Sequence, residues 1–450
     1  MQRCQKKRGQ YPLIALVLFA FIVFSVFFNG SNIDETSPSE EHPFLVSKNL
    51  TAPEFNPARE LDKFSKCHNT VEYSGRGANW DAPVPESGGR REMPESCDFF
   101  SGEWVFDNTS HPLYSEFDCP YMSDQLACQK HGRPEKGYQH WRWQPHGCDL
   151  KRWNATEMWE KLRGKRLMFV GDSLNRNQWM SMVCMLQSVI PSNKRYMSPQ
   201  QHLSIFRTEV DYLRSTYSSC GCMQEYNASV EFLWAPLLVE SNSDHPVDHR
   251  LSERILRPDS LLRHLSHWRN ADILVFNSYL WWRQGPVKLL WSNEQNGACE
   301  EIDGLRGMEL AMRAWADWVA SNVDPLKKQV FFVTMSPTHQ SKEEWEPGSE
   351  GNCYDEKLPI TNRAYWGNGS DAATMQMVGR VLSDLGTKVS VLNITKLSEY
   401  RKDGHPTIYR KFWEELPPER LANPASYSDC IHWCLPGVPD VWNELLFQFL

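Results

Sequence analysis

Strand-like runs alternate with helical patterns from residue 166 onward, and this alternation restricts the fold more than any other feature. The runs are rich in Val, Leu, Ile and Phe and cover 166–170, 230–239, 272–276, 329–335 and 388–394. Strands separated by helices are typical of βαβ units, whose strands run parallel. The sequence therefore predicts an α/β fold with a mostly parallel sheet flanked by helices.

Three helices have clear patterns. Apolar residues at spacings of three and four mark one face of a helix at Leu305, Met308, Met312, Trp315 and Val319, and Trp318 points away from that face. A second helix is predicted over 371–385, with Ser370 as its N-cap and Gly386 at its end. A closing helix is predicted over 438–449, after a loop with Pro436 and Gly437.

An apolar run at 11–28 follows the basic residues Arg3, Lys6, Lys7 and Arg8. A helix of this length rises roughly 27 Å, close to the roughly 30 Å hydrocarbon core of a bilayer. The basic flank predicts a cytoplasmic tail at 1–10 and a single-pass anchor at 11–28 that leaves the rest in a lumen. A cleaved signal peptide is the alternative. Prolines and polar residues at 29–96 predict an extended stem.

Cysteines and glycosylation motifs agree with a lumenal body. Seven N-x-[ST] sequons lie at Asn29, Asn49, Asn108, Asn154, Asn227, Asn368 and Asn393. Twelve of the 13 cysteines follow the anchor, where disulfides are their default state, and Cys4 stands alone before it. A module rich in Cys and Trp is predicted at 97–163, followed by the main domain at 164–450.

Composition excludes some classes of protein. With 41% hydrophobic and 23% charged residues among 450, the chain can build a core and is not disordered as a whole. Its formal net charge of −8 argues against nucleic acid as a partner, because binding to phosphates requires a basic surface.

Ser173 is a candidate nucleophile, because Gly171-Asp172-Ser173 follows a predicted strand and opens a helical stretch. There, backbone N–H groups at a helix N-terminus can stabilise negative charge. The alternative is that Ser173 only caps the helix.

A base for this serine is offered by Asp429 and His432, whose spacing lets the carboxylate bind one imidazole nitrogen while the other faces a hydroxyl. Two alternatives are less consistent with the sequence. Zinc binding by Cys430, His432 and Cys434 lacks a paired C-x-x-C, so no metal is predicted. His405 could act as the base, but it lacks the Asp-x-x-His context.

Together these motifs resemble the GDSL/SGNH esterase superfamily. Residues 170–178 and 432–444, with Cys97-Asp-Phe-Phe-Ser-Gly-Glu-Trp104, resemble a narrower group, the plant trichome-birefringence-like family of cell-wall polysaccharide O-acetyltransferases. The resemblance runs from about 97 to 450. It implies an SGNH-like fold with a disulfide-tied N-terminal module, and a type II protein of the Golgi membrane.

The resemblance also implies roles for residues. Ser173 is the nucleophile, His432 the base and Asp429 its orienting partner, in a double displacement through an acetyl-serine. No cofactor is bound, but an acetyl donor is required. Asn277 and Arg176 are candidate oxyanion donors, and Trp281 and Trp282 form either a sugar-stacking wall or part of the core. The implied disulfides are Cys97–Cys148, Cys119–Cys184, Cys128–Cys434 and Cys353–Cys430, and one of Cys220 and Cys222 is a plausible partner for Cys299.

Xylan is the expected acceptor, because 235–244 and 276–282 resemble xylan-acting members of that family. The sequence is also compatible with two other functions. An acetylesterase would use the same triad with water as acceptor, and a glycan-binding protein would use the tryptophans without catalysis.

Overall fold

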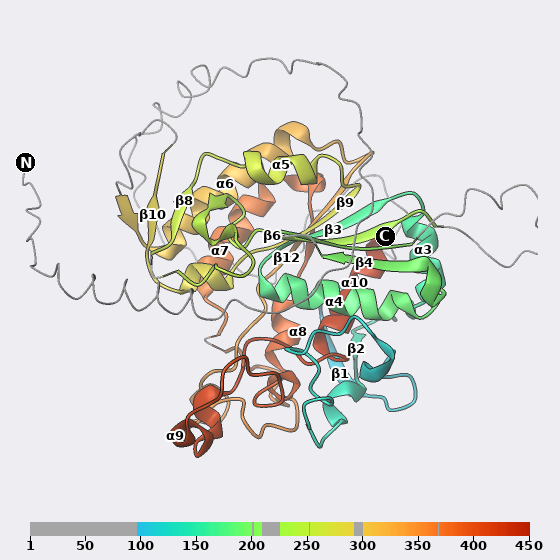
Figure 1. Cartoon of the computed structure of the whole chain (residues 1–450), viewed down its shortest axis with the longest axis vertical. Helices are drawn as coiled ribbons and strands as arrows, with labels where there is room; N and C mark the ends of the chain where they lie inside the picture. The colour runs from blue at the N-terminus through green and yellow to red at the C-terminus, as the bar shows by residue number, and fades with distance from the viewer. Residues whose placement is uncertain (1–96, 200–201, 209–225, 252, 292–299, 368) are drawn as a thin grey trace, which may run out of the picture. The chain divides into compact units, whose positions relative to one another are not determined.

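The computed structural model describes residues 97–450 except 200–201, 209–225, 252, 292–299 and 368, and all of the described residues belong to one compact unit (Figure 1). The predicted tail at 1–10, anchor at 11–28 and stem at 29–96 lie outside the described residues, as do Cys4, Cys67, Cys220, Cys222 and Cys299. Across the described ranges, no helix combines the length and apolar character needed to span a bilayer.

A seven-stranded sheet forms the centre of the molecule, which confirms the predicted α/β class. Its order is β13 (Ser390–Leu392), β12 (Gln329–Val333), β9 (Ile273–Asn277), β3 (Arg166–Gly171), β6 (Ser229–Trp234), β5 (Leu203–Thr208) and β4 (Arg195–Pro199). The first five strands are parallel and correspond to the five predicted runs. The antiparallel edge strands β4 and β5 were not predicted.

Helices cover both faces of this sheet, which explains why its five parallel strands are mostly apolar. Neighbouring residues of β12 face opposite sides: Phe331 packs on Phe449, and Phe332 packs on Trp315. Figure 1 shows α4 and α10 on one side of the sheet and α5 and α6 on the other. The helices are α3 (Ala155–Leu162), α4 (Ser173–Gln187), α5 (Leu262–Trp268), α6 (Gly304–Asn322), α7 (Ala372–Ser383), α8 (Thr395–Glu399), α9 (Pro418–Leu421) and α10 (Val438–Phe449).

The helix predictions need two corrections. The side chain of Asp371, not Ser370, caps α7 by accepting the backbone N–H of Thr374, because Ser370 instead donates to the buried carboxylate of Glu399. Trp318 does not point away from the core: it is buried, and its ring packs on Trp268 of α5 at 5.1 Å. The closing helix α10 has the predicted bounds.

A smaller four-stranded sheet shares no strand pairing with the central sheet. It contains β11 (Glu300–Ile302), β10 (Val287–Leu289), β8 (Ile255–Arg257) and β7 (Glu240–Ser241). These strands are two or three residues long, so no period-2 pattern could reveal them in the sequence.

The N-terminal module pairs β1 (Gly102–Phe106) with β2 (Trp141–Pro145) and is otherwise mostly loops and turns. All four predicted disulfides are present, with Cα separations from 5.3 to 5.9 Å. Two of them join the module to later parts of the chain, Cys119 to α4 and Cys128 to the loop before α10. The module is therefore tied covalently to the segments that carry the site.

Candidate active site

Ser173 lies where β3 ends and α4 begins, at the carboxyl edge of the parallel sheet. The turn requires Gly171, because a Cβ there would lie 2.1 Å from the carbonyl oxygen of Asn277. Asp172 caps α4 by accepting the backbone N–H of Leu174 at 2.9 Å. The cap is thus provided by Asp172, and the hydroxyl of Ser173 is left for another partner.

That partner is His432, as the sequence suggested. The ring nitrogen Nε2 of His432 lies 2.8 Å from the hydroxyl oxygen of Ser173, and Nδ1 lies 2.8 Å from Oδ2 of Asp429. The other oxygen of Asp429 accepts the backbone N–H groups of Ile431 and His432. Since the carboxylate accepts a hydrogen from Nδ1, the nitrogen facing Ser173 is the bare one and can accept the hydroxyl proton.

The electrostatics of Asp429 keep it ionised. Burial raises the pKa of this carboxyl, but the positive charge of His432, the hydrogen bonds from its ring and backbone, and Arg410 outweigh burial and hold the pKa well below its usual range. Asp172 behaves differently, since burial raises its pKa to about 6 despite the hydrogen bond from Leu174 and the charge of His432. Only Asp429 is therefore fixed as an anion across the neutral and mildly acidic range.

The loop that carries His432 is held on several sides. Disulfides fix Cys430 and Cys434, the residues two positions before and after His432. Asp429 and Thr407 exchange two backbone hydrogen bonds, and the N–H of Trp433 donates to Asn177 of α4. The histidine is thus positioned by covalent and hydrogen-bonded contacts to four separate segments: those that contain Cys128, Cys353, Thr407 and Asn177.

The N-terminal module contributes a side chain to this site. Gln125 places its amide nitrogen 3.2 Å from Nδ1 of His432, and its amide oxygen accepts Nη2 of Arg176 at 3.0 Å. Arg176, one of the two predicted oxyanion donors, is therefore hydrogen-bonded to Gln125, whose side chain lies against the ring of His432. Nothing in the sequence around Gln125 marks it, because only the folded module brings it next to α4.

The other predicted oxyanion donor, Asn277, lies at the end of β9 opposite Gly171. Its amide nitrogen donates to the carbonyl oxygens of Val333 and Thr334 at 3.1 and 3.2 Å. The amide nitrogen of Asn277 is therefore directed at the main chain after β12.

Trp281 and Trp282 lie in a short 3₁₀ helix, η6 (Leu280–Arg283), and are only 5% and 4% exposed. Trp281 packs edge-on against Trp234, and the indole N–H of Trp282 donates to Ser278. This burial favours the packing interpretation over a sugar-stacking wall.

The structure also bears on two alternatives for the loop that carries His432, namely His405 as the base and zinc binding by Cys430, His432 and Cys434. The ring of His405 is fully buried and bonded to the carbonyl of His432, so it does not face Ser173. Cys430 and Cys434 are in disulfides and cannot act as thiolate ligands of zinc. Among the described residues, no group of three or more His, Cys, Asp or Glu is arranged to hold a metal.

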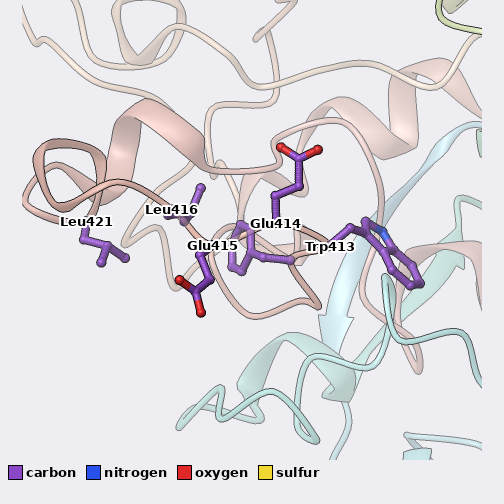
Figure 2. A pocket seen from close by; sticks show the side chains of 6 residues that line it. Trp413, Glu414, Glu415, Leu416 and Leu421 are labelled. Atoms are coloured by element: carbon purple, nitrogen blue, oxygen red, sulfur yellow. The ribbon is translucent and has the colours of Figure 1, made fainter. Parts of the chain in front are cut away.

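An exposed aromatic residue lies on the loop after Arg410, which itself contacts the triad aspartate. The Nε of Arg410 is 3.8 Å from Asp429, and the N–H of Lys411 donates to Asp124 of the N-terminal module. Two residues later, Trp413 is 76% exposed and borders an open pocket of about 330 Å³ (Figure 2). The other residues of the pocket are Phe412, Glu414, Glu415, Leu416 and Leu421.

A serine, a histidine and an aspartate aligned at the carboxyl edge of a parallel sheet define an enzyme of the SGNH class that acts on acyl groups. Comparison with known proteins agrees: residues 150–449 match the GDSL/SGNH-like acyl-esterase family found in Pmr5 and Cas1p, and residues 95–149 match the PMR5 N-terminal domain. The chain belongs to this acyl-esterase family.

Several plant proteins are similar to the chain over most of their length. Protein trichome birefringence-like 35 of Arabidopsis thaliana is 60% identical, with 100% of each chain covered. Xylan O-acetyltransferase 14 of Oryza sativa subsp. japonica is 48% identical, with 79% of this chain and 77% of the relative covered. Probable xylan O-acetyltransferase 10 of the same plant is 48% identical, with 79% and 78% covered.

Proposed function

We propose that this chain transfers acetyl groups to hydroxyls of a cell-wall polysaccharide, with xylan as the acceptor. The observation that carries the proposal is the unbroken hydrogen-bonded line from Ser173 through His432 to Asp429, with 2.8 Å at each step. The names of the rice relatives, which are 48% identical, support xylan as the acceptor.

The first half-reaction forms the acetyl-serine. The oxygen of Ser173 attacks the acetyl carbonyl of the donor while Nε2 of His432 takes the hydroxyl proton and then passes it to the leaving group. The negative oxygen of the tetrahedral intermediate needs a hydrogen-bond donor. The backbone N–H of Ser173 is suitable, because it lies in the first turn of α4, where N–H groups have no partner within the helix.

The second half-reaction releases the acetyl group to the sugar. The bare Nε2 of His432 accepts the proton of a sugar hydroxyl, whose oxygen attacks the acetyl carbonyl. The ester bond to Ser173 then breaks, and Nε2 returns the proton to the oxygen of Ser173. Water in the place of the sugar would give acetate, so the same residues are able to catalyse hydrolysis. Excluding water from the acceptor position is what separates a transferase from an esterase.

The proposed location is the Golgi lumen, with the segment at 11–28 as a single-pass anchor and the N-terminus in the cytoplasm. Four disulfides support an oxidising compartment. All four sequon asparagines in the described part of the chain are exposed, as glycosylation requires: Asn108, Asn154, Asn227 and Asn393.

The function is tested by incubating the full-length chain with an acetyl donor, either acetyl-CoA or p-nitrophenyl acetate, and with xylooligosaccharides. Acetylated sugar, detected by mass spectrometry and mapped by NMR, is the expected product. The Ser173→Ala variant should lose about 10³- to 10⁶-fold in rate, whereas Ser192→Ala, at an exposed serine, should not. Free acetate without acetylated sugar would instead identify an esterase, and full activity of Ser173→Ala would reject both enzymes.

A further inference from the structure

Two buried histidines that take no part in the triad lie directly behind the catalytic loop. His339 follows β12, and His405 follows the short 3₁₀ helix η9 (Lys402–Gly404). Both are fully buried, and the ring of His405 stacks on that of Trp433 at 4.2 Å. A second feature sets them apart from other buried histidines: their rings are bonded to each other.

The two rings take part in a continuous row of three short contacts. Nδ1 of His405 lies 2.7 Å from the carbonyl oxygen of His432, and Nε2 of His339 lies 2.8 Å from the carbonyl oxygen of Glu399. The two remaining nitrogens, Nε2 of His405 and Nδ1 of His339, face each other at 2.7 Å. This row of contacts therefore begins at the backbone carbonyl of His432 and ends at the backbone carbonyl of Glu399, the last residue of α8.

Counting hydrogens gives the charge of this pair. A carbonyl oxygen only accepts hydrogen bonds, so each of the two nitrogens that face a carbonyl must carry a hydrogen. The contact between the rings needs one more hydrogen, because two bare nitrogens at 2.7 Å would repel each other. Three hydrogens are one more than two neutral imidazoles carry, so the observed geometry corresponds to a pair with one positive charge.

We propose that His339 and His405 share one proton, and that the charged pair positions the main chain of His432 so that its ring meets Ser173. Loss of the proton leaves only two hydrogens for three contacts, so one contact must open. The pair is thus a proton-dependent positioning device for the triad. The kinetic part of this inference rests on the proposed function, whereas the sharing of the proton does not.

Some charged groups around the two histidines favour a positive charge on the pair, and others oppose it. Asp429 on the catalytic loop and Asp403 on η9 favour the positive charge, whereas Lys402 on η9 and Arg133 from the N-terminal module oppose it. Asp403 is already paired with Arg401, and Lys402 with Glu356.

Burial is the largest influence. It lowers the pKa of His339 to about 4 and holds the pKa of His405 well below its usual range. The pair therefore takes up its proton at acidic pH and releases it as the pH rises toward neutrality.

The proton is tested directly by solid-state NMR of the full-length chain with ¹⁵N-labelled histidine rings. Subtracting the spectrum of the double variant His339→Gln/His405→Gln should leave two N–H nitrogens and a third that is about half protonated at pH 4, but two N–H and two bare nitrogens at pH 8. A ¹⁵N–¹⁵N coupling across the inter-ring hydrogen bond gives the same information in the unaltered chain if the double variant does not fold. Two bare nitrogens at pH 4, or no coupling, would overturn the proposal.

The positioning role is tested by the dependence of kcat and KM on pH. In His339→Gln we expect kcat to fall about 10- to 100-fold, as for a small misplacement of a catalytic group, with KM within about two-fold of the original value. The alkaline limb of the kcat profile should also disappear, because the amide does not titrate. His202→Gln is the matched control, because His202 also bonds a backbone carbonyl.

An unchanged profile in His339→Gln would overturn the positioning role. Failure of the proposed function would look different: the NMR result would stand, but the unaltered chain would form no acetyl-Ser173 from p-nitrophenyl acetate.

Discussion

At the scale of single residues, Asp429 offers the sharpest prediction. Replacing it with Asn keeps an oxygen for the backbone N–H groups but removes the charge that holds the hydrogen on Nδ1 of His432. The ring can then place its hydrogen on Nε2, which no longer accepts from Ser173. We expect kcat to fall about 10⁴-fold with little change in KM, measured as acetyl transfer at the pH where the unaltered chain is most active.

Asp248→Asn, at an exposed carboxylate, is the control for that substitution. A loss of less than about ten-fold in Asp429→Asn would show that the carboxylate does not set the tautomer of His432.

The triad could be predicted from sequence because each of its members lies in a motif that has local meaning. Gly171-Asp172-Ser173 marks a strand-to-helix turn, and Asp429 and His432 are three residues apart. Gln125 and His339 could not be predicted, because their roles depend on contacts to residues hundreds of positions away or on a second buried ring. The packing role of Trp281 could be stated only as an alternative, since its residue type alone does not distinguish a core ring from an exposed one.

At the scale of elements, the loop that carries His432 depends on its disulfides. The disulfide Cys128–Cys434 joins residues that are 306 positions apart in the sequence. Arg133, which like Cys128 belongs to the N-terminal module, donates to Cys434. Removing both cysteines as Cys128→Ser/Cys434→Ser should lower the free energy of unfolding by about 2–5 kcal/mol. It should also lower kcat at temperatures where the chain remains folded, because the loop loses one of its anchors.

The pair Cys97→Ser/Cys148→Ser provides the comparison, since this disulfide lies within the N-terminal module. It should reduce stability but leave kcat close to the original value. Equal losses of kcat in both variants would mean that the disulfides act only through overall stability. Unfolding by urea, followed by tryptophan fluorescence, gives the stability of each variant.

The loop from Arg410 to Trp413 leads to a prediction about the acceptor. Exposed aromatic rings suit the apolar faces of sugars, and Trp413 lies three residues from the contact to Asp429. If the ring of Trp413 binds the polysaccharide beyond the reacting sugar, Trp413→Ala should raise KM for long xylan about 2- to 12-fold. This range corresponds to a loss of about 0.5–1.5 kcal/mol of binding free energy for one aromatic contact. KM for p-nitrophenyl acetate should not change.

Trp366→Ala is a suitable control for this prediction, because Trp366 is also partly exposed but lies on another loop. If both substitutions raised KM for long xylan equally, the change would not be specific to the position of Trp413. An unchanged KM for long xylan in Trp413→Ala would exclude this ring from the acceptor site.

At the scale of the whole molecule, the N-terminal module, α4 and α10 meet at one buried carboxyl. Asp440 of α10 accepts the hydroxyls of Tyr114 from the module and Ser181 from α4, at 3.0 and 2.5 Å. Sequence patterns located each of these parts but not their junction, because Tyr114 and Ser181 show no relation to Asp440 until the chain is folded. The junction has a consequence for stability, since burial raises the pKa of Asp440 to about 6.

The direction of this pH effect on stability depends on whether the folded or the unfolded chain binds the proton of Asp440 more tightly. The folded chain holds the proton of Asp440 up to about pH 6, whereas an unfolded aspartate releases it near its ordinary value of 3.8. Folding is therefore favoured at low pH, and the free energy of unfolding falls as the pH rises from about 4 to about 6. At about 1.4 kcal/mol per pKa unit, this contribution is on the order of 2–3 kcal/mol.

Comparing the chain with its Asp440→Asn variant isolates this contribution from other titrating groups. We expect the difference in unfolding free energy between the two to shift by that amount between pH 4 and pH 7, in favour of the variant at the higher pH. Asp248→Asn should show no such shift. A constant difference across this range would mean that Asp440 is ionised in the folded chain throughout, and that its two hydroxyl partners and the N–H of Gly437 fully offset its burial.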